Sequence, residues 1–288
     1  MSAVSGFHSK KPNWADPATA SANVLPTSYC PEPRSRDEKE LPNVILAWKT
    51  LYEAGINFID TAEAYGNGES ERIVGELIKN FPRESVIIQT KYFSTPLKAT
   101  NFIHPVDAPV KSLKASLQCM NLEYVDIYLV YGPIHPQSIQ NIAKDVQKIN
   151  DELAKFNIPL ATNQCEYNIL RRYPELTGNI EKCISSGMIF HKDNPPPKSY
   201  RFSSYKMEDL EPVLKTLQRV AKRRGKSTAS IALNYNISKG VLPVVGIRNV
   251  KQAKCASEAL GWRLTDSEMV EIDKVSIEGD KTVLWQQG

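Results

Sequence analysis

Hydrophobic and polar positions in the first half of the chain follow two alternating periods. Apolar residues recur at helical spacing in residues 41–54, 70–79 and 109–120, and short apolar runs rich in β-branched residues fill residues 57–60, 86–91 and 125–130. Gly55 follows the first helical stretch as a common helix stop. The pattern predicts helices that alternate with strands, and this order calls for a parallel sheet flanked by helices.

The second half of the chain continues this alternation less regularly. We expect helices over residues 138–156, 180–186, 207–224, 228–239 and 250–260, strands over residues 159–162, 188–190 and 241–245, and a polar loop over residues 191–205. The first forty residues are rich in Ser, Ala and Pro and show no sustained period. The sequence therefore predicts a flexible N-terminal arm over residues 1–40 and one α/β domain over residues 41–288.

Composition and charge narrow the class of protein. Of the 288 residues, 41% are hydrophobic and 24% are charged, values typical of a globular domain, which argues against a disordered chain or a disulfide scaffold. No apolar run approaches the roughly 18 residues of a membrane span. The net charge of +4 is too small and too scattered to indicate a nucleic-acid footprint. We expect neither membrane insertion nor a nucleic-acid partner.

The cysteines and the N-terminal arm indicate the cellular compartment in which the protein is expected. The five cysteines are odd in number and form no CxxC pair, as expected of thiols in a reducing compartment, and they predict no metal site. The arm lacks the apolar core of about 7 to 15 residues that a secretory signal needs. Its acidic residues and few arginines also match a transit peptide poorly. We expect a cytoplasmic protein.

Alternating strands and helices over roughly 250 residues fit either a (β/α)8 barrel or an open doubly wound sheet. An open dinucleotide-binding sheet would carry GxGxxG just after its first strand, and the chain has no such motif. Polar residues instead gather at the carboxyl ends of the predicted strands, where barrel enzymes hold their chemistry. This distribution favours the barrel.

Three polar residues converge at these strand ends. Asp60 ends one predicted strand, Tyr65 follows in the next loop, and Lys91 ends the next strand. A phenol has an ordinary pKa of about 10, which an adjacent ammonium lowers, and a carboxylate keeps that ammonium charged and oriented. The set therefore predicts a proton donor for a carbonyl oxygen.

Several long motifs support this interpretation and identify a family. The segment GINFIDTAEAYGNGESERIVGELI, the following strand that ends in TK, and the later segments VDIYLVYGP, PLATNQCEYNILRR and PVVGIRNVKQAKCASEALGWRLT resemble the aldo-keto reductases. The resemblance covers most of residues 41–288. It implies a (β/α)8 barrel, NADP(H) bound in an extended form at the carboxyl ends of the strands, and reduction of an aldehyde or ketone. It also accounts for the absent GxGxxG, because this family binds its cofactor without a Rossmann domain.

The resemblance places the family's catalytic residues in this sequence. Its aspartate, tyrosine and lysine fall on Asp60, Tyr65 and Lys91. Its fourth residue, usually the histidine of VHGP, falls on Tyr131 in VYGP, and a tyrosine hydroxyl still donates a hydrogen bond to a substrate oxygen. His135 lies four residues further on, beyond the predicted strand end, and we do not assign it a catalytic role.

The resemblance also implies a cofactor site. Its residues are Gln164, Gly246, Ile247, Arg248 and Gln252. Gln164 matches the glutamine that contacts the nicotinamide carboxamide. Arg248 stands at a predicted helix start, where a guanidinium and backbone N–H groups suit the adenosine 2′-phosphate of NADPH. The family's usual adenine-contacting Glu and Asn are replaced by Cys255 and Ala256.

Three pieces of the family pattern are missing. No first strand with a Gly-rich turn precedes residue 41, and no strand ending in Ser-Asn lies between residues 145 and 146. Between Phe190 and His191 the chain lacks the segment that brings an aromatic onto the nicotinamide, together with the loop that clasps the pyrophosphate. A barrel that loses a strand either keeps a gap with two edges or splays. The sequence thus predicts an incomplete barrel.

These losses leave three functions open. The first is NADPH-dependent reduction of a small-molecule carbonyl substrate. The second is a noncatalytic NADP(H)-binding or regulatory module, similar to the aldo-keto-like subunits that attach to membrane channels. The third is a defective fragment.

Overall fold

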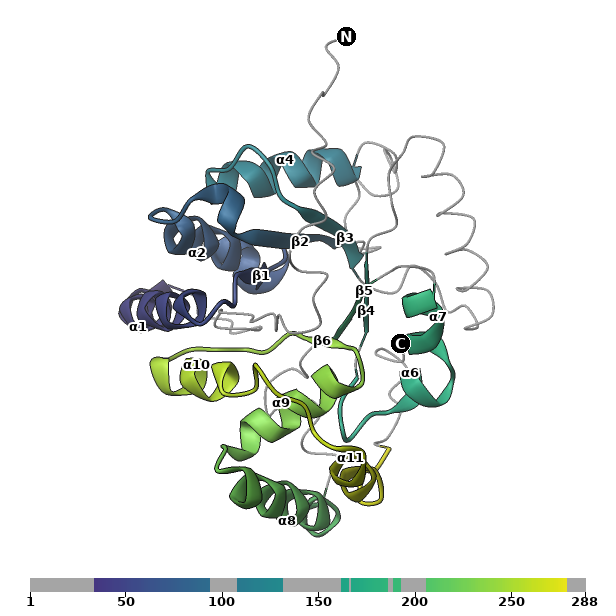
Figure 1. The fold of residues 1–288 in the computed structure, drawn as a ribbon. Coiled ribbons are helices and arrows are strands. Elements are labelled where there is room, and N and C mark those ends of the chain that lie inside the picture. Colours follow the sequence, from purple (N-terminus) through teal and green to yellow (C-terminus); the bar gives the residue numbers. More distant parts are fainter. Residues whose placement is uncertain are drawn as a thin grey trace.

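Helices surround parallel strands in an α/β arrangement (Figure 1). The computed structural model describes residues 34–93, 108–131, 162–165, 167–185, 189–192 and 206–278. Within these ranges six strands form two three-stranded sheets, one of order β1-β2-β3 and the other of order β4-β5-β6, and all of their pairings are parallel. The α/β class and the parallel sheets agree with the sequence prediction.

The first sheet contains β1 (Phe58–Asp60), β2 (Ile87–Phe93) and β3 (Ile127–Tyr131). Its helices are α1 (Arg34–Glu53), α2 (Glu69–Ile78) and α4 (Ala108–Met120), and the short 3-10 turns η2 (Tyr65–Gly68) and η3 (Arg83–Ser85) precede α2 and β2. A buried core of Trp48, Leu51, Ile59, Ile73 and Ile88 joins these helices to the strands. This half of the chain follows the sequence prediction closely.

The second sheet contains β4 (Thr162–Cys165), β5 (Ile189–Lys192) and β6 (Leu242–Pro243). Its helices are α6 (Tyr173–Leu176), α7 (Asn179–Ser185), α8 (Met207–Arg224), α9 (Thr228–Ser238) and α11 (Asp266–Asp273), and α10 (Val250–Ser257) packs on α1. A separate core contains Tyr167, Val213, Val220, Tyr235 and Ile272. Each sheet therefore has its own buried apolar cluster.

Several predicted boundaries are corrected, among them the strand expected over residues 159–162, because β4 continues to Cys165. Helix α1 begins at Arg34, upstream of the helix start predicted at residue 41. Pro42 suggests a start near residue 41, because proline suits the first helical turn, but the structure continues the helix upstream of it. Strand β5 includes His191 and Lys192, which pair with β4 and β6, so the polar loop does not begin at residue 191. The helix predicted over residues 138–156 lies outside the described residues.

The two sheets form separate hydrogen-bonded ladders among the residues that the structure describes. Along the chain, one break between ladders falls between β3 and β4, and the other separates β6 from β1. The predicted strand losses, near residues 145–146 and before residue 41, fall at these two junctions. The third predicted loss, at Phe190 and His191, leaves β5 intact as a strand.

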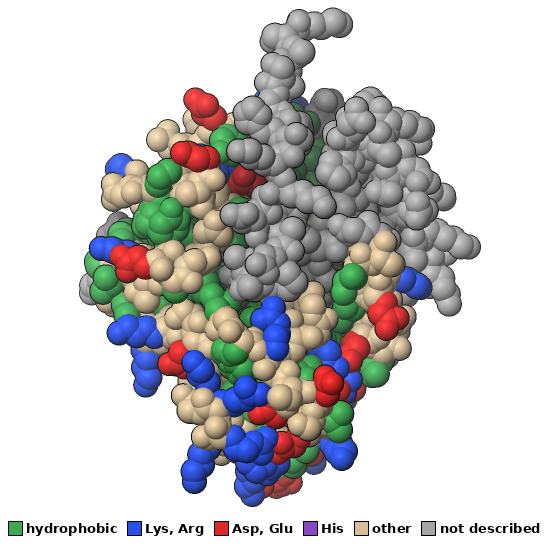
Figure 2. Space-filling view, in the orientation of Figure 1, with side chains coloured by type: hydrophobic (Ala, Val, Ile, Leu, Met, Phe, Trp, Pro, Cys, Tyr) green, Lys and Arg blue, Asp and Glu red, His purple; other side chains and the backbone are tan. Residues whose placement is uncertain are grey.

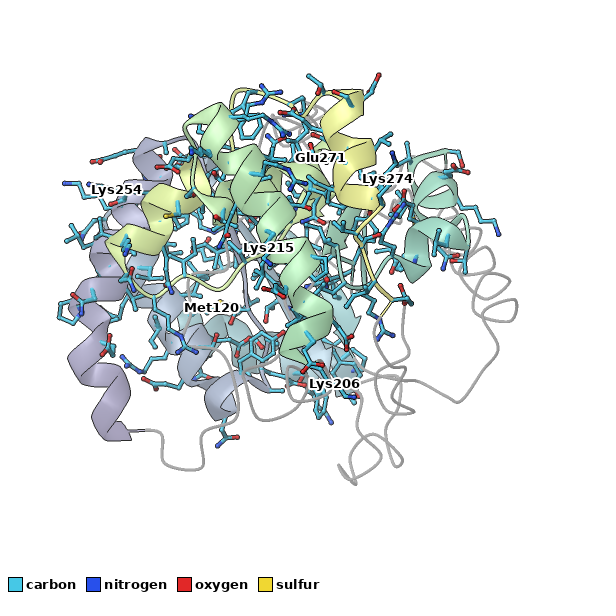
Figure 3. The ribbon with its side chains drawn as sticks, turned by 90° about the horizontal axis from the view of Figure 1, so that it is seen from below. Met120, Lys206, Lys215, Lys254, Glu271 and Lys274 are labelled. Atoms are coloured by element: carbon cyan, nitrogen blue, oxygen red, sulfur yellow. The ribbon has the colours of Figure 1, made fainter. Side chains whose placement is uncertain are left out.

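Acidic side chains of α11 form ion pairs with arginines near the end of α8, and charged side chains of both signs cover the lower end of the molecule (Figure 2). Glu271, labelled in Figure 3, accepts from Arg219 at 2.7 Å and from Arg223 at 2.5 Å. Arg224 donates to Glu268 at 2.9 Å. Gly225 then ends the helix with a left-handed φ of 62°.

Candidate active site

A buried ion pair joins the ends of β1 and β2. Lys91 Nζ lies 2.7 Å from both carboxylate oxygens of Asp60, and the exposed fractions of the two side chains are 1% and 0%. Lys91 also donates to the carbonyl oxygen of Thr61 at 3.0 Å. The parallel register of β1 and β2 produces this contact, since Asp60 pairs with Gln89 and side chains alternate along a strand. Removing either partner of such a buried ion pair would leave the other charge buried without compensation, which destabilises the fold.

Tyr65 approaches this pair from the loop that follows β1. Its hydroxyl lies 3.4 Å from Lys91 Nζ, and the centre of its ring lies 4.9 Å from the same atom. The positive φ of Gly66 and Gly68 allows the tight turn of η2 that places Tyr65 there. The ammonium can therefore stabilise the phenolate that remains when the hydroxyl gives up its proton.

Glu63 ties the same loop to its surroundings. Its carboxylate accepts from the backbone N–H of Phe93 at 2.7 Å and from the hydroxyl of Ser112 in α4. Burial raises the pKa of Tyr92, and the charge of Glu63 raises it further, so this neighbouring phenol stays protonated. The loop that carries Tyr65 is thus anchored to β2 and to α4.

Gln164 brings the second sheet to this site. Its Nε2 lies 3.4 Å from Asp60 Oδ2, and its Oε1 accepts a 2.9 Å hydrogen bond from Gln89 Nε2. The structure therefore brings together Asp60, Tyr65, Lys91 and Gln164. The backbone of Tyr131 pairs with Phe93 at the end of β3, but its side chain lies outside the described part.

Gln89 is a site residue that sequence reasoning missed. It is fully buried, and its Nε2 also donates to Asp60 Oδ1 at 2.6 Å. Among the described residues its Oε1 has no hydrogen-bond partner. The available signal was its place two residues before Lys91, which puts both side chains on the same face of β2.

The remaining predicted cofactor residues lie at the start of α10. Ile247 is buried in the first core, whereas Arg248 is exposed, and its backbone N–H donates to Gln252 Oε1 at 2.7 Å. Asn249 caps the helix by accepting from the backbone N–H of Gln252 at 3.0 Å. Gly246 precedes this cap in an exposed position. This segment presents a guanidinium beside a helix N-terminus, a suitable arrangement for a phosphate.

Two wider properties of the described residues bear on the site's chemistry. They contain no group of three or more His, Cys, Asp and Glu side chains that could hold a metal ion. None of the helices in that part of the chain is long and apolar enough to cross a membrane.

Comparisons with known proteins point in one direction. The model of the Aldo/keto reductase family matches residues 34–152 and 138–277. Chloroplastic pyridoxal reductase of Arabidopsis thaliana is 26% identical over 284 residues, which cover 83% of this chain and 78% of that protein. The crystal structure of the thermostable aldo-keto reductase Tm1743 in complex with the inhibitor epalrestat has a TM-score of 0.66 at 24% identity and covers 89% of this chain and 94% of its own.

An aldo-keto reductase of Klebsiella pneumoniae, solved in complex with NADPH, has a TM-score of 0.64 at 19% identity and covers 94% of this chain and 95% of its own. At such low identity the two solved structures are evidence for a shared fold. The family match extends over both described sheets.

Proposed function

Because the chain belongs to the aldo/keto reductase family, we propose that it is an NADP(H)-dependent oxidoreductase that reduces an aldehyde or ketone to an alcohol. The observation that carries this proposal is the placement of the Tyr65 hydroxyl 3.4 Å from the buried ammonium of Lys91, which Asp60 holds at 2.7 Å. The substrate in this proposal is a small-molecule carbonyl compound.

The residues present fit the cofactor. Arg248 offers an exposed guanidinium beside the capped start of α10, and this suits the extra phosphate of NADP(H). Gln164 offers a half-buried amide at the site, and amides pair well with the carboxamide of nicotinamide. When bound, the nicotinamide supplies the hydride that reaches the carbonyl carbon.

The protein's own residues move the proton. Tyr65 donates its hydroxyl proton to the carbonyl oxygen, and Lys91 stabilises the phenolate that is left until water returns the proton. Asp60 holds the ammonium in place and compensates its charge in a site that excludes water. In this proposal Tyr131 takes the position of the family histidine and donates a hydrogen bond to the substrate oxygen.

We further propose that the two described sheets are arcs of one (β/α)8 barrel that lacks strands where the ladders break. The helices lie outside the strands, and the solved aldo-keto reductases share the overall fold. The barrel domain then extends from α1 to the end of the chain, so it begins at residue 34 instead of residue 41.

Removing one hydroxyl tests the proposed reaction. General acid catalysis contributes roughly 10² to 10⁴ in rate, so Tyr65→Phe should lower turnover of a simple aromatic aldehyde by about that factor and leave NADPH affinity nearly unchanged. NADPH consumption, followed by absorbance, measures the rate. Tyr52→Phe is the matched control. It removes a tyrosine hydroxyl that donates to Ser85 Oγ at 2.7 Å, in the contact between α1 and η3.

The outcomes separate the three functions. Loss of turnover in Tyr65→Phe alone supports the reductase, and equal rates in parent and variant refute it. Tight NADPH binding by the parent without turnover of any carbonyl compound supports the noncatalytic module. A parent that binds no nucleotide is a defective fragment.

A further inference from the structure

We propose that Gln89 is a positioning residue that couples the proton-donating group on the first sheet to Gln164 on the second. The inference rests on the proposed function, because it assigns Gln89 an effect on NADP(H) binding through Gln164. Gln89 itself need not touch the cofactor or the substrate.

The hydrogen bonds of Gln89 define this link. Its amide nitrogen carries two N–H groups, and it lies 2.6 Å from Asp60 Oδ1 and 2.9 Å from Gln164 Oε1. Both acceptors are oxygen atoms, so a flipped amide would place Oε1 against two acceptors and lose both bonds. The orientation of the Gln89 amide is therefore fixed by its two partners.

Stability alone does not explain a glutamine at this position. The side chain is fully buried, and within the described ranges its Oε1 has no hydrogen-bond partner. A buried acceptor without a partner destabilises a fold, and an apolar side chain of the same length would avoid that penalty. The contribution of Gln89 therefore lies in the two bonds that it donates.

These two bonds act on different parts of the site. The bond to Asp60 holds the carboxylate that also receives Lys91. The bond to Gln164 engages its Oε1. The two N–H groups of Gln164 can then donate to Asp60 Oδ2, which lies 3.4 Å away, and to the oxygen of a nicotinamide carboxamide. Gln89 thus selects which end of the Gln164 amide is offered to a nicotinamide.

A double-mutant cycle tests this coupling. Methionine matches the length of glutamine and removes its donors, so the four proteins are the parent, Gln89→Met, Gln164→Met and the double variant. Dissociation constants for NADPH are measured by fluorescence titration. Because a neutral hydrogen bond corresponds to roughly a two- to tenfold change in affinity, each single variant should weaken binding by about that factor. The double variant should bind no more weakly than Gln164→Met alone.

Two further variants separate positioning from general loss of stability. Thr90→Val removes a buried 2.7 Å hydrogen bond to Glu71 on the opposite face of β2, and it should leave the NADPH dissociation constant unchanged. Gln89→Asn keeps an amide that is too short to reach both acceptors, so it should weaken NADPH binding as Gln89→Met does. It also tests the proposal if Gln89→Met does not fold.

Three results would overturn the coupling. The coupling is refuted if the losses of affinity in Gln89→Met and Gln164→Met multiply in the double variant. It is also refuted if Thr90→Val weakens NADPH binding as much as Gln89→Met does. In both cases NADPH binding by the parent and the Tyr65 result still support the reductase. A parent that binds no NADPH refutes the proposed function, and the coupling fails with it.

Discussion

The carboxylate of Glu175 in α6 lies at the centre of a partly buried polar network, and its charge should stabilise the fold in a pH-dependent way. It accepts from Tyr167 Oη at 2.9 Å, from Arg172 Nε at 2.8 Å and from Lys239 Nζ at 2.6 Å. Tyr167 follows β4, the strand that carries Gln164. The substitution Glu175→Gln removes the charge and keeps the size of the side chain.

The size of the effect follows from the pKa of Glu175. Burial opposes ionisation of this carboxyl, but the hydrogen bonds from Arg172, Lys239 and Tyr167 outweigh burial and lower its pKa from 4.5 to about 2. The side chain is 25% exposed, so solvent screening is limited. A pKa difference of this size corresponds to about 3 kcal/mol of folding free energy at neutral pH.

The sign of the pH dependence follows from the lowered pKa. The folded pKa lies below the unfolded one, so the full stabilisation is present above about pH 5 and is lost as the pH falls toward 2. At pH 3 it should have fallen to about 1 kcal/mol.

Urea unfolding at pH 7 and at pH 3 measures this contribution. The free energy of unfolding of Glu175→Gln should be lower than that of the parent by about 3 kcal/mol at pH 7, and the gap should narrow to about 1 kcal/mol at pH 3. Glu181→Gln, at an exposed position on α7, is the control and should change stability by less than about 0.5 kcal/mol. A gap of equal size at both pH values would contradict the assignment of the effect to this carboxylate.

Two further predictions concern packing and the cofactor. A Cβ atom at Gly75 would lie 2.4 Å from the backbone oxygen of Met120, so Gly75→Ala should destabilise the protein by about 1 to 3 kcal/mol in thermal unfolding, although alanine favours helix. A raised melting temperature would show that α2 and α4 do not pack this closely. Arg248→Ala should weaken NADPH binding roughly tenfold and leave NADH binding unchanged, with Lys251→Ala as the exposed control. Equal loss for both nucleotides would exclude a specific contact with the 2′-phosphate.

Sequence patterns predicted that Asp60, Tyr65 and Lys91 lie close together because their positions follow local rules. Asp60 and Lys91 end neighbouring parallel strands, and such ends meet at the same edge of a sheet. Gln89 could not be assigned in this way, since its partner Gln164 is 75 residues away on another sheet. The distance between two sheets depends on tertiary packing, which the hydrophobic pattern of a single strand does not predict.

The sequence carries a local signal for the start of helix α11. Thr265 and Glu268 form a capping box, and the sequence TDSE carries its signature. The start of α1 is harder to predict from the sequence. Proline is common in the first turn of a helix, so Pro42 indicates a start near residue 41 and gives no sign of the helical residues before it.

The separation of the two larger apolar clusters among the described residues has a consequence for how the molecule opens. Asp60, Lys91 and the segment that carries Arg248 are attached to the first cluster, which includes Ile59, Ile88 and Ile247. Gln164 belongs to β4, and Tyr167 and Ile169, which follow β4 in the chain, are buried in the second cluster. Cooperative units of a protein can unfold separately and refold while the rest stays native. In the binding mode proposed above, an excursion confined to the second cluster would release the nicotinamide end of a bound dinucleotide while its adenosine phosphate stayed tethered, so the same molecule could rebind without returning to solution.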